Sequence, residues 1–188
     1  MMGKDLNHIF KLLSVLLQYP DEHYLCRIKE LEAIVASMPS NEFENSISEF
    51  IIYIKTLSLI QLQEIYTAAF DMSPATTMNL TYHIWGDTEK RAGRLARMQQ
   101  VYQDAGYERT TGELPDYLPM MLEFLSLCPE AKGIELVWEC FKHFDKYIDR
   151  LQQSAPAYSA LLQPLARMTV KRFQSEGISA QQITADRP

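Results

Sequence analysis

Apolar residues recur at intervals of three and four along nearly the whole chain of 188 residues. The pattern is clear in residues 5–18, 41–57, 59–71 and 134–151. Such spacing places the apolar side chains on one face of an α-helix. Alternating runs of five or more residues are hard to find, and the hairpin dipeptides Asn-Gly and Asp-Gly are absent. The sequence therefore predicts an all-α protein, in which the helix over 5–18 is central and largely buried.

Capping residues divide this pattern into about eight or nine helices with short connections. Asp21, Ser58, Asp87 and Asp116 are each expected to cap the helix that follows, because their side-chain oxygens can accept hydrogen bonds from its first N–H groups. No fixed internal repeat of the kind that builds a solenoid is visible. A single globular helical bundle is therefore predicted.

Prolines supply further boundaries. Ser73-Pro74 is expected to begin a short helix over about 75–82, with serine at the cap and proline in the first turn. Pro129-Glu130 is expected to open the longest helix, which would run to Leu151. Pro164 is expected to kink or split the last helix, because proline cannot donate the hydrogen bond of the helix interior.

The chain length suits one domain, predicted over residues 1–174. Residues 175–188 are polar and aperiodic and predict a flexible tail. The three cysteines form no CxxC pair, which favours a reducing compartment. Neither a signal peptide nor an apolar run long enough for a membrane span is visible. These features predict a cytoplasmic protein without stable membrane insertion.

The sequence contains no motif for metal binding, phosphate binding or nucleophilic catalysis. HExxH, GxxxxGK[ST], GxGxxG after a strand, and GxSxG are all absent. The net charge of −6 disfavours nucleic acid as a partner. A basic run stands out at Lys90, Arg91, Arg94 and Arg97, which is either an anion or docking site or, more commonly for such runs, a solvated helix face.

Two stretches of the sequence contain side chains that core packing alone does not require. Residues 66–86 mix Tyr, His, Trp, Met and Asn, the side chains that a groove for an apolar peptide helix needs, although ordinary core packing explains them equally well. In residues 113–119, two prolines four positions apart stiffen the entry to a helix. That loop could present Glu113, Asp116 and Tyr117 to a cationic or hydrogen-bonding ligand, or could simply be a well-capped helix start.

At these stretches the sequence resembles the nitrate reductase delta-subunit chaperones, the NarJ type, within the redox-enzyme maturation family that includes TorD and DmsD. The resemblance covers about residues 8–172. It rests on the run Leu12 to Asp21, on Tyr66 to Phe70, on Ser73 to Gly86, and on Glu113-Leu114-Pro115-Asp116-Tyr117-Leu118-Pro119. In the wider family a histidine follows the aspartate of this last run, whereas Tyr117 stands here, as in the nitrate reductase branch.

The resemblance implies an all-α fold, a cytoplasmic location and no catalytic activity. It implies binding to the N-terminal segment of the apo catalytic (alpha) subunit of a respiratory nitrate reductase, which is held while molybdenum cofactor and an iron–sulfur cluster are inserted. The chain itself is expected to carry no cofactor. A homodimer is compatible with the family, whose helical members can exchange elements between copies. The rival hypotheses are a carrier that binds molybdenum cofactor or nucleotide on the Lys90–Arg97 face, and a purely structural bundle.

The resemblance and the two stretches together predict a peptide-binding site. An apolar groove is expected to accept one face of a peptide helix, with carboxylates on its border pairing with basic residues of the peptide. The expected peptide-binding residues are Tyr66, Phe70, Asp71, Leu80, Tyr82, His83, Trp85, Glu113, Pro115, Asp116, Tyr117 and Glu123.

Overall fold

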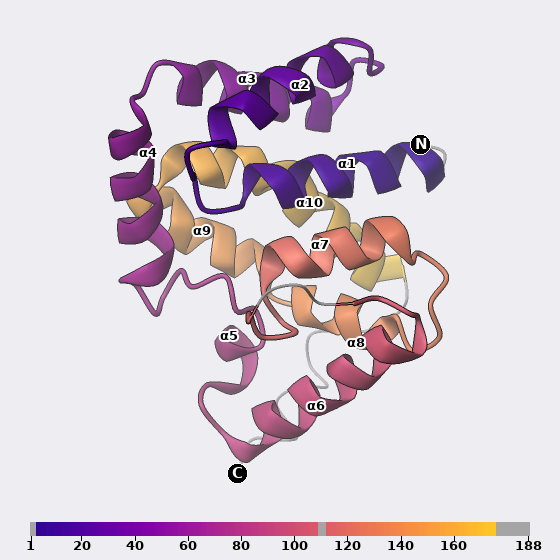
Figure 1. Cartoon of the computed structure of the whole chain (residues 1–188). Coiled ribbons are helices and arrows are strands. Elements are labelled where there is room, and N and C mark those ends of the chain that lie inside the picture. The colour runs from indigo at the N-terminus through magenta and orange to yellow at the C-terminus, as the bar shows by residue number, and fades with distance from the viewer. Residues whose placement is uncertain (1–2, 109–111, 176–188) are drawn as a thin grey trace.

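The computed structural model describes residues 3–108 and 112–175, and the regular elements within them are all helices or helical turns (Figure 1). An isolated β-bridge between Asn79 and Tyr117 is the only extended pairing among these residues. The all-α prediction is confirmed. The helical elements are α1 (Gly3–Leu16), α2 (Tyr24–Ala36), α3 (Glu42–Lys55), α4 (Leu59–Tyr66), the π turn η1 (Thr67–Asp71), α5 (Tyr82–Trp85), α6 (Glu89–Asp104), α7 (Leu118–Leu127), α8 (Glu135–Trp138), the 3₁₀ turn η2 (Glu139–Phe141), α9 (Phe144–Ser154) and α10 (Pro156–Ser175).

The centre of the bundle is formed by four helices, α1, α7, α9 and α10. α1 packs along α7, and α10 packs against both α9 and α3. Figure 1 shows α2 and α3 at one end of the bundle, α5 and α6 at the opposite end, and the four core helices between them. Ile9, Phe10, Leu13 and Leu16 of α1 are all buried, which confirms that this helix is central. Burial of apolar side chains such as these is the main driving force for folding.

Local capping chemistry explains some helix starts and not others. Ser58 caps α4 as predicted, in a capping box with Gln61. The cap of α6 is Thr88 and not Asp87, because the Thr88 hydroxyl accepts the N–H of Arg91 while Asp87 points into solvent. The cap of α2 is His23, two residues after the predicted Asp21. The Asp21 carboxylate instead accepts the N–H of His23 in the preceding turn.

The helix predicted over 75–82 is wrong. The chain makes a turn in which the N–H of Thr76 donates to the carbonyl of Ser73, and helical structure begins only at Tyr82. The intervening segment bonds to a distant one: the N–H of Leu118 donates to the carbonyl of Met78 at 2.9 Å. Such buried long-range bonds satisfy the backbone as well as a helix does, so the local start signal is overridden.

Two helix boundaries expected at prolines are also absent. The long helix predicted from residue 130 to Leu151 begins only at Glu135, after Gly133 with a φ of 82°, and the backbone of His143 (φ −123°, ψ 31°) separates η2 from α9. The expected split at Pro164 is absent, and α10 continues through it. Pro164 is buried in the tightly packed α9–α10–α3 layer. We attribute the continuity to this packing, which compensates for the missing hydrogen bond.

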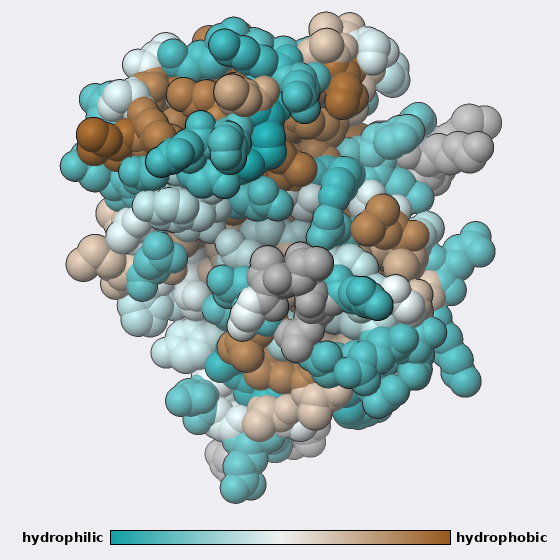
Figure 2. Space-filling model, viewed as in Figure 1, coloured by the Kyte–Doolittle hydropathy of each residue, from teal (hydrophilic) through white to brown (hydrophobic). Residues whose placement is uncertain are grey.

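The flexible tail predicted over 175–188 lies outside the described residues from position 176 onward. Among the residues described, no helix combines the length and apolar character of a membrane span. Figure 2 shows hydrophobic surface on the α2–α3 side of the molecule. Exposed large apolar residues of α2, α3 and α4 are Ile34, Ile52 and Ile60.

Candidate functional site

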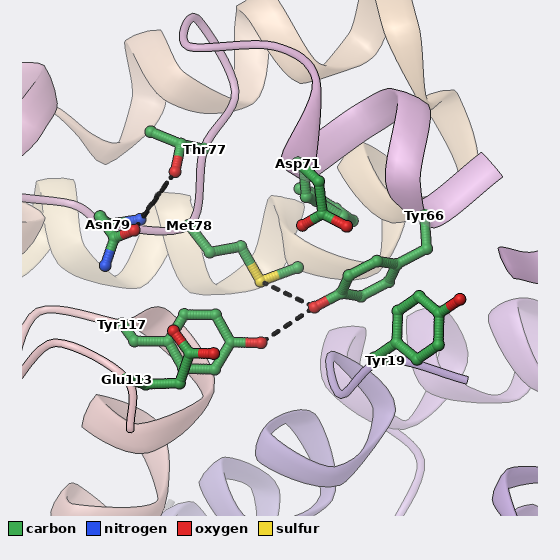
Figure 3. A pocket seen from close by; sticks show the side chains of 9 residues that line it. Tyr19, Tyr66, Asp71, Thr77, Met78, Asn79, Glu113 and Tyr117 are labelled. Carbon is green, nitrogen blue, oxygen red and sulfur yellow. Dashed lines mark hydrogen bonds between the residues drawn. The ribbon is translucent and has the colours of Figure 1, made fainter. Parts of the chain in front are cut away.

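A pocket of about 300 Å³ opens where four segments meet. The corner between α1 and α2, the end of α4 with η1, residues 77–79, and the loop before α7 each contribute a wall (Figure 3). Its size is at the lower end of the range for small ligand sites. The lining residues are Tyr19, Tyr66, Phe70, Asp71, Thr77, Met78, Asn79, Glu113 and Tyr117.

Two tyrosines join opposite walls of this pocket. The hydroxyl oxygens of Tyr66 and Tyr117 lie 2.9 Å apart, as Figure 3 shows, and the Tyr66 hydroxyl also donates to the carbonyl of Leu17 at 3.2 Å. Burial raises the pKa of both phenols, and the nearby carboxylate of Asp71 raises the pKa of each further. Both hydroxyl groups therefore stay protonated at neutral pH, where they are uncharged and able to form hydrogen bonds.

The π turn η1 follows α4 and forms the pocket wall up to the pocket mouth. The N–H of Met72 donates to the carbonyl of Thr67 five residues earlier, which widens the helix by one residue. Turns of this type inside α-helices are frequently found at functional sites. Here the turn ends on Asp71, which is exposed, while Phe70 is buried against Tyr66 with ring centroids 5.0 Å apart.

Asp116 is the buried support of the pocket. Its side chain is 0% exposed. Its carboxylate accepts hydrogen bonds from the Thr81 N–H at 3.2 Å, from the Thr81 hydroxyl, from Asn79 Nδ2 at 3.1 Å and from Arg91 Nη2 at 3.3 Å. The prediction that Asp116 caps the next helix is wrong, since the cap position of α7 is Tyr117. Asp116 instead ties residues 79–81 to the loop before α7.

The structure brings part of the predicted site together. Tyr66, Phe70 and Asp71 meet Glu113 and Tyr117 in one pocket, although more than forty positions separate the two stretches in sequence. Four lining residues were not among the predicted ones. Tyr19 lies in the run Leu12 to Asp21 that resembles the family but was not predicted to bind peptide. The other three fell within the helix wrongly predicted over 75–82; they are Thr77, Met78 and Asn79.

Leu80 and Pro115 lie behind the pocket wall, where both are buried. The carbonyl of Pro115 accepts a hydrogen bond from the Tyr102 hydroxyl at 2.7 Å. Glu123 projects from α7 toward Lys11 and Tyr107. Burial alone would raise the pKa of Glu123, but these two hydrogen bonds hold it below its usual range. None of these three residues lines the pocket.

Tyr82, His83 and Trp85 belong to α5 and also lie outside the pocket lining. The guanidinium of Arg91 lies over the Tyr82 ring at 5.8 Å, and that of Arg94 over the Trp85 ring at 5.0 Å. Arg94 pairs in addition with Glu139. Two of the four cations in the basic run are therefore used inside the fold, which weakens its interpretation as an anion site.

His83 makes a pH-dependent contribution to stability. Burial lowers its pKa, and this effect outweighs the contact of Nε2 with the carbonyl of Thr77 at 2.8 Å. Because the folded-state pKa is lower than the unfolded value of about 6.5, the contribution is complete above that pH and is lost as the pH falls below it. We expect His83→Gln to lose less unfolding free energy than the wild type between pH 7.5 and 5.5 in urea titrations. An equal loss in both proteins would contradict this assignment.

Comparison with known proteins identifies the family. The family described as nitrate reductase delta subunit matches residues 38–163, which include both sequence stretches of the pocket. Among curated relatives, the "probable nitrate reductase molybdenum cofactor assembly chaperone NarJ" of Bacillus subtilis is 30% identical over 83% of this chain and 85% of its own length. The nitrate reductase molybdenum cofactor assembly chaperone NarJ of Escherichia coli K12 is 27% identical over 89% of this chain and 72% of its own.

A solved structure supports the fold. A protein from Archaeoglobus fulgidus, assigned to redox enzyme maturation, superimposes with a TM-score of 0.58 at 24% identity and covers 93% of this chain and 94% of its own. Within the described residues, no three His, Cys, Asp or Glu side chains converge as metal ligands. The family match extends over most of the helical domain and the whole of the pocket region except Tyr19. The chain belongs to the nitrate reductase delta-subunit family.

Proposed function

We propose that this chain is an assembly chaperone for a respiratory nitrate reductase, and that it binds the N-terminal segment of the apo catalytic subunit while molybdenum cofactor and an iron–sulfur cluster are inserted. Its relatives in B. subtilis and E. coli are described as nitrate reductase molybdenum cofactor assembly chaperones. The observation that carries the proposal is the pocket, which is assembled from the two stretches that resemble the family. The role is one of binding and holding, without catalysis, and we place it in the cytoplasm, before the subunit docks on its membrane anchor.

The pocket suits a peptide because its walls combine apolar area with polar edges. Phe70 and Met78 supply apolar surface, and the tyrosines add flat rings whose hydroxyls can form hydrogen bonds. Met72 and Leu114 directly follow the lining residues Asp71 and Glu113 in sequence and are exposed, which adds two apolar side chains next to the pocket. Apolar burial should supply most of the affinity, and the carboxylates should set orientation and association rate.

The rival hypothesis places molybdenum cofactor or a nucleotide on the Lys90–Arg97 face. The burial of Arg91 against Asp116 and the pairing of Arg94 with Glu139 leave less of that charge for a ligand. Purified protein that carries stoichiometric pterin or nucleotide, and loses it on Arg97→Ala, would favour the rival over the chaperone.

Tyr19 gives a clean test of the pocket. Its ring is 45% exposed and meets the Tyr66 ring edge-on at 5.3 Å, so its removal should cost the fold little. We expect Tyr19→Ala to weaken binding of a synthetic peptide covering the N-terminal segment of the cognate catalytic subunit by about tenfold, or about 1.4 kcal/mol. Isothermal titration calorimetry measures the affinity.

The matched control is Ile60→Ala, which removes another exposed apolar side chain, on α4 outside the pocket. Its affinity should stay within about twofold of the wild type. A peptide that fails to bind the wild-type protein would overturn the proposed function. Equal affinities of the two variants would show that the peptide binds elsewhere.

A further inference from the structure

Carboxylates reach the pocket from two of its walls. Asp71 ends the π turn on one side, and Glu113 lies in the loop before α7 on another, as Figure 3 shows. The described residues that line the pocket include no Lys, Arg or His. The Asp71 side chain makes no hydrogen bond or ion pair within residues 3–108 and 112–175, whereas Glu113 already has an interaction of its own. Asp71 is therefore the carboxylate best placed to receive a cation.

The surfaces between these carboxylates are aromatic and uncharged. The Tyr19 and Tyr66 rings meet edge-on at one side, and the Tyr117 ring lies at the other. The phenols stay neutral because burial raises the pKa of Tyr66 and Tyr117. A cation among aromatic rings gains from their negative faces, and its aliphatic stem can cover apolar surface such as Met78. The carboxylates at the ends of the pocket and the aromatic rings along its sides are thus both suited to bind one long cationic side chain.

Arginine fits this arrangement better than lysine. A guanidinium is planar, is less strongly hydrated than an ammonium, and stacks on aromatic rings. It also directs N–H donors in several directions, so a single group can address Asp71 and a phenol oxygen together. The exposed Met72 and Leu114 directly follow Asp71 and Glu113 in sequence, so apolar surface lies beside both carboxylates.

We propose that the pocket holds one arginine of the client's N-terminal segment, with apolar client residues on either side of it resting on Met72 and Leu114. This inference rests on the proposed function and adds to it the side chain that fixes the register of the bound segment. It also assigns two kinds of contact: Asp71 pairs with the charge of the arginine, and Met72 and Leu114 contact the apolar client residues on either side of it. A client segment that contains no arginine contradicts the inference at once.

The test replaces each arginine of the synthetic client peptide, one at a time, by citrulline, which keeps the shape and removes the charge. At one position, calorimetry should show about a tenfold or greater loss of affinity, and lysine there should give an intermediate value. Asp71→Asn should weaken the unmodified peptide by a similar factor but should leave the affinity of that citrulline peptide unchanged, because the coupled pair is already broken. Asp149→Asn, an exposed aspartate of α9, is the matched control and should bind every peptide like the wild type.

The outcomes distinguish the inference from the proposed function. If the peptide binds but no citrulline costs more than twofold, or Asp71→Asn shows no coupling, the arginine site is wrong and the chaperone proposal stands. If the unmodified peptide does not bind at all, the chaperone proposal fails. N-acetylarginine amide and N-acetylcitrulline amide then decide the pocket chemistry by NMR. Saturable shifts of the Tyr19 ring with the arginine compound alone, lost in Asp71→Asn, support the site, and their absence overturns it.

Discussion

Replacing Asp116 with asparagine should lower the free energy of unfolding by about 3 kcal/mol or more. The side chain is fully buried, and its carboxylate neutralises the guanidinium of Arg91, whose side chain is only 12% exposed. Asparagine keeps the shape but removes the charge, which leaves a nearly buried cation without its main counter-ion. It also weakens the bonds that hold residues 79–81 to the loop before α7. Urea unfolding followed by circular dichroism measures the change.

Asp87→Asn is the matched control. Asp87 lies 4.0 Å from the same guanidinium, but its side chain is 96% exposed. Water screens an exposed pair of this kind, so the variant should stay within about 0.5 kcal/mol of the wild type. Similar stabilities of the Asp116 and Asp87 variants would show that Asp116 is not a structural support. Tests of client binding should therefore change Asp71 or Tyr19, because loss of Asp116 would alter the whole site.

Phe124→Ala should lower the free energy of unfolding by about 3–5 kcal/mol. Phe124 is completely buried in α7, with its ring centroid 4.5 Å from that of Tyr102 and 5.5 Å from that of Tyr107. The truncation removes transfer free energy and leaves a cavity beside Tyr102, whose hydroxyl holds the carbonyl of Pro115. The midpoint of urea unfolding should fall while the slope stays the same.

Leu127→Ala on the same helix provides the comparison. Leu127 is exposed, so its removal creates no cavity and should change stability by about 0.5 kcal/mol or less. A loss below about 1 kcal/mol in Phe124→Ala would mean that the surrounding aromatic residues close over the space. In that case the packing of Phe124 against Tyr102 and Tyr107 would not be what holds the loop before α7 in place.

Helices whose stability depends on a continuous apolar face are predictable from the sequence. The spacing of Ile9, Phe10 and Leu13 alone predicts that α1 lies in the core, and Ser58 marks the start of α4. Both features are local, since each depends on residues within a turn or two along the chain. The prediction for the segment before α5 failed because its partners lie some forty positions away, in the stretch around Asp116 and Leu118.

The same limit explains what the sequence showed of the pocket. The two stretches that resemble the family contain Tyr66, Asp71, Glu113 and Tyr117, but their contact across the pocket could not be predicted from either stretch alone. Asp116 looked like a helix cap because aspartate before a helix is most often one. Only the fold reveals that Arg91 and Thr81 surround it.

Site-specific photo-crosslinking tests the central proposal, capture of the client's N-terminal segment at this pocket, most directly. A benzophenone amino acid at Met72, a rim residue 77% exposed, is irradiated in cells that co-express the catalytic subunit. The same group at Ile52, exposed on α3 outside the pocket, serves as the reference. The account predicts crosslinks from position 72 that map to the N-terminal segment of the catalytic subunit, with few from position 52. Equal crosslinking from both positions, or crosslinks that map elsewhere on the catalytic subunit, would contradict it.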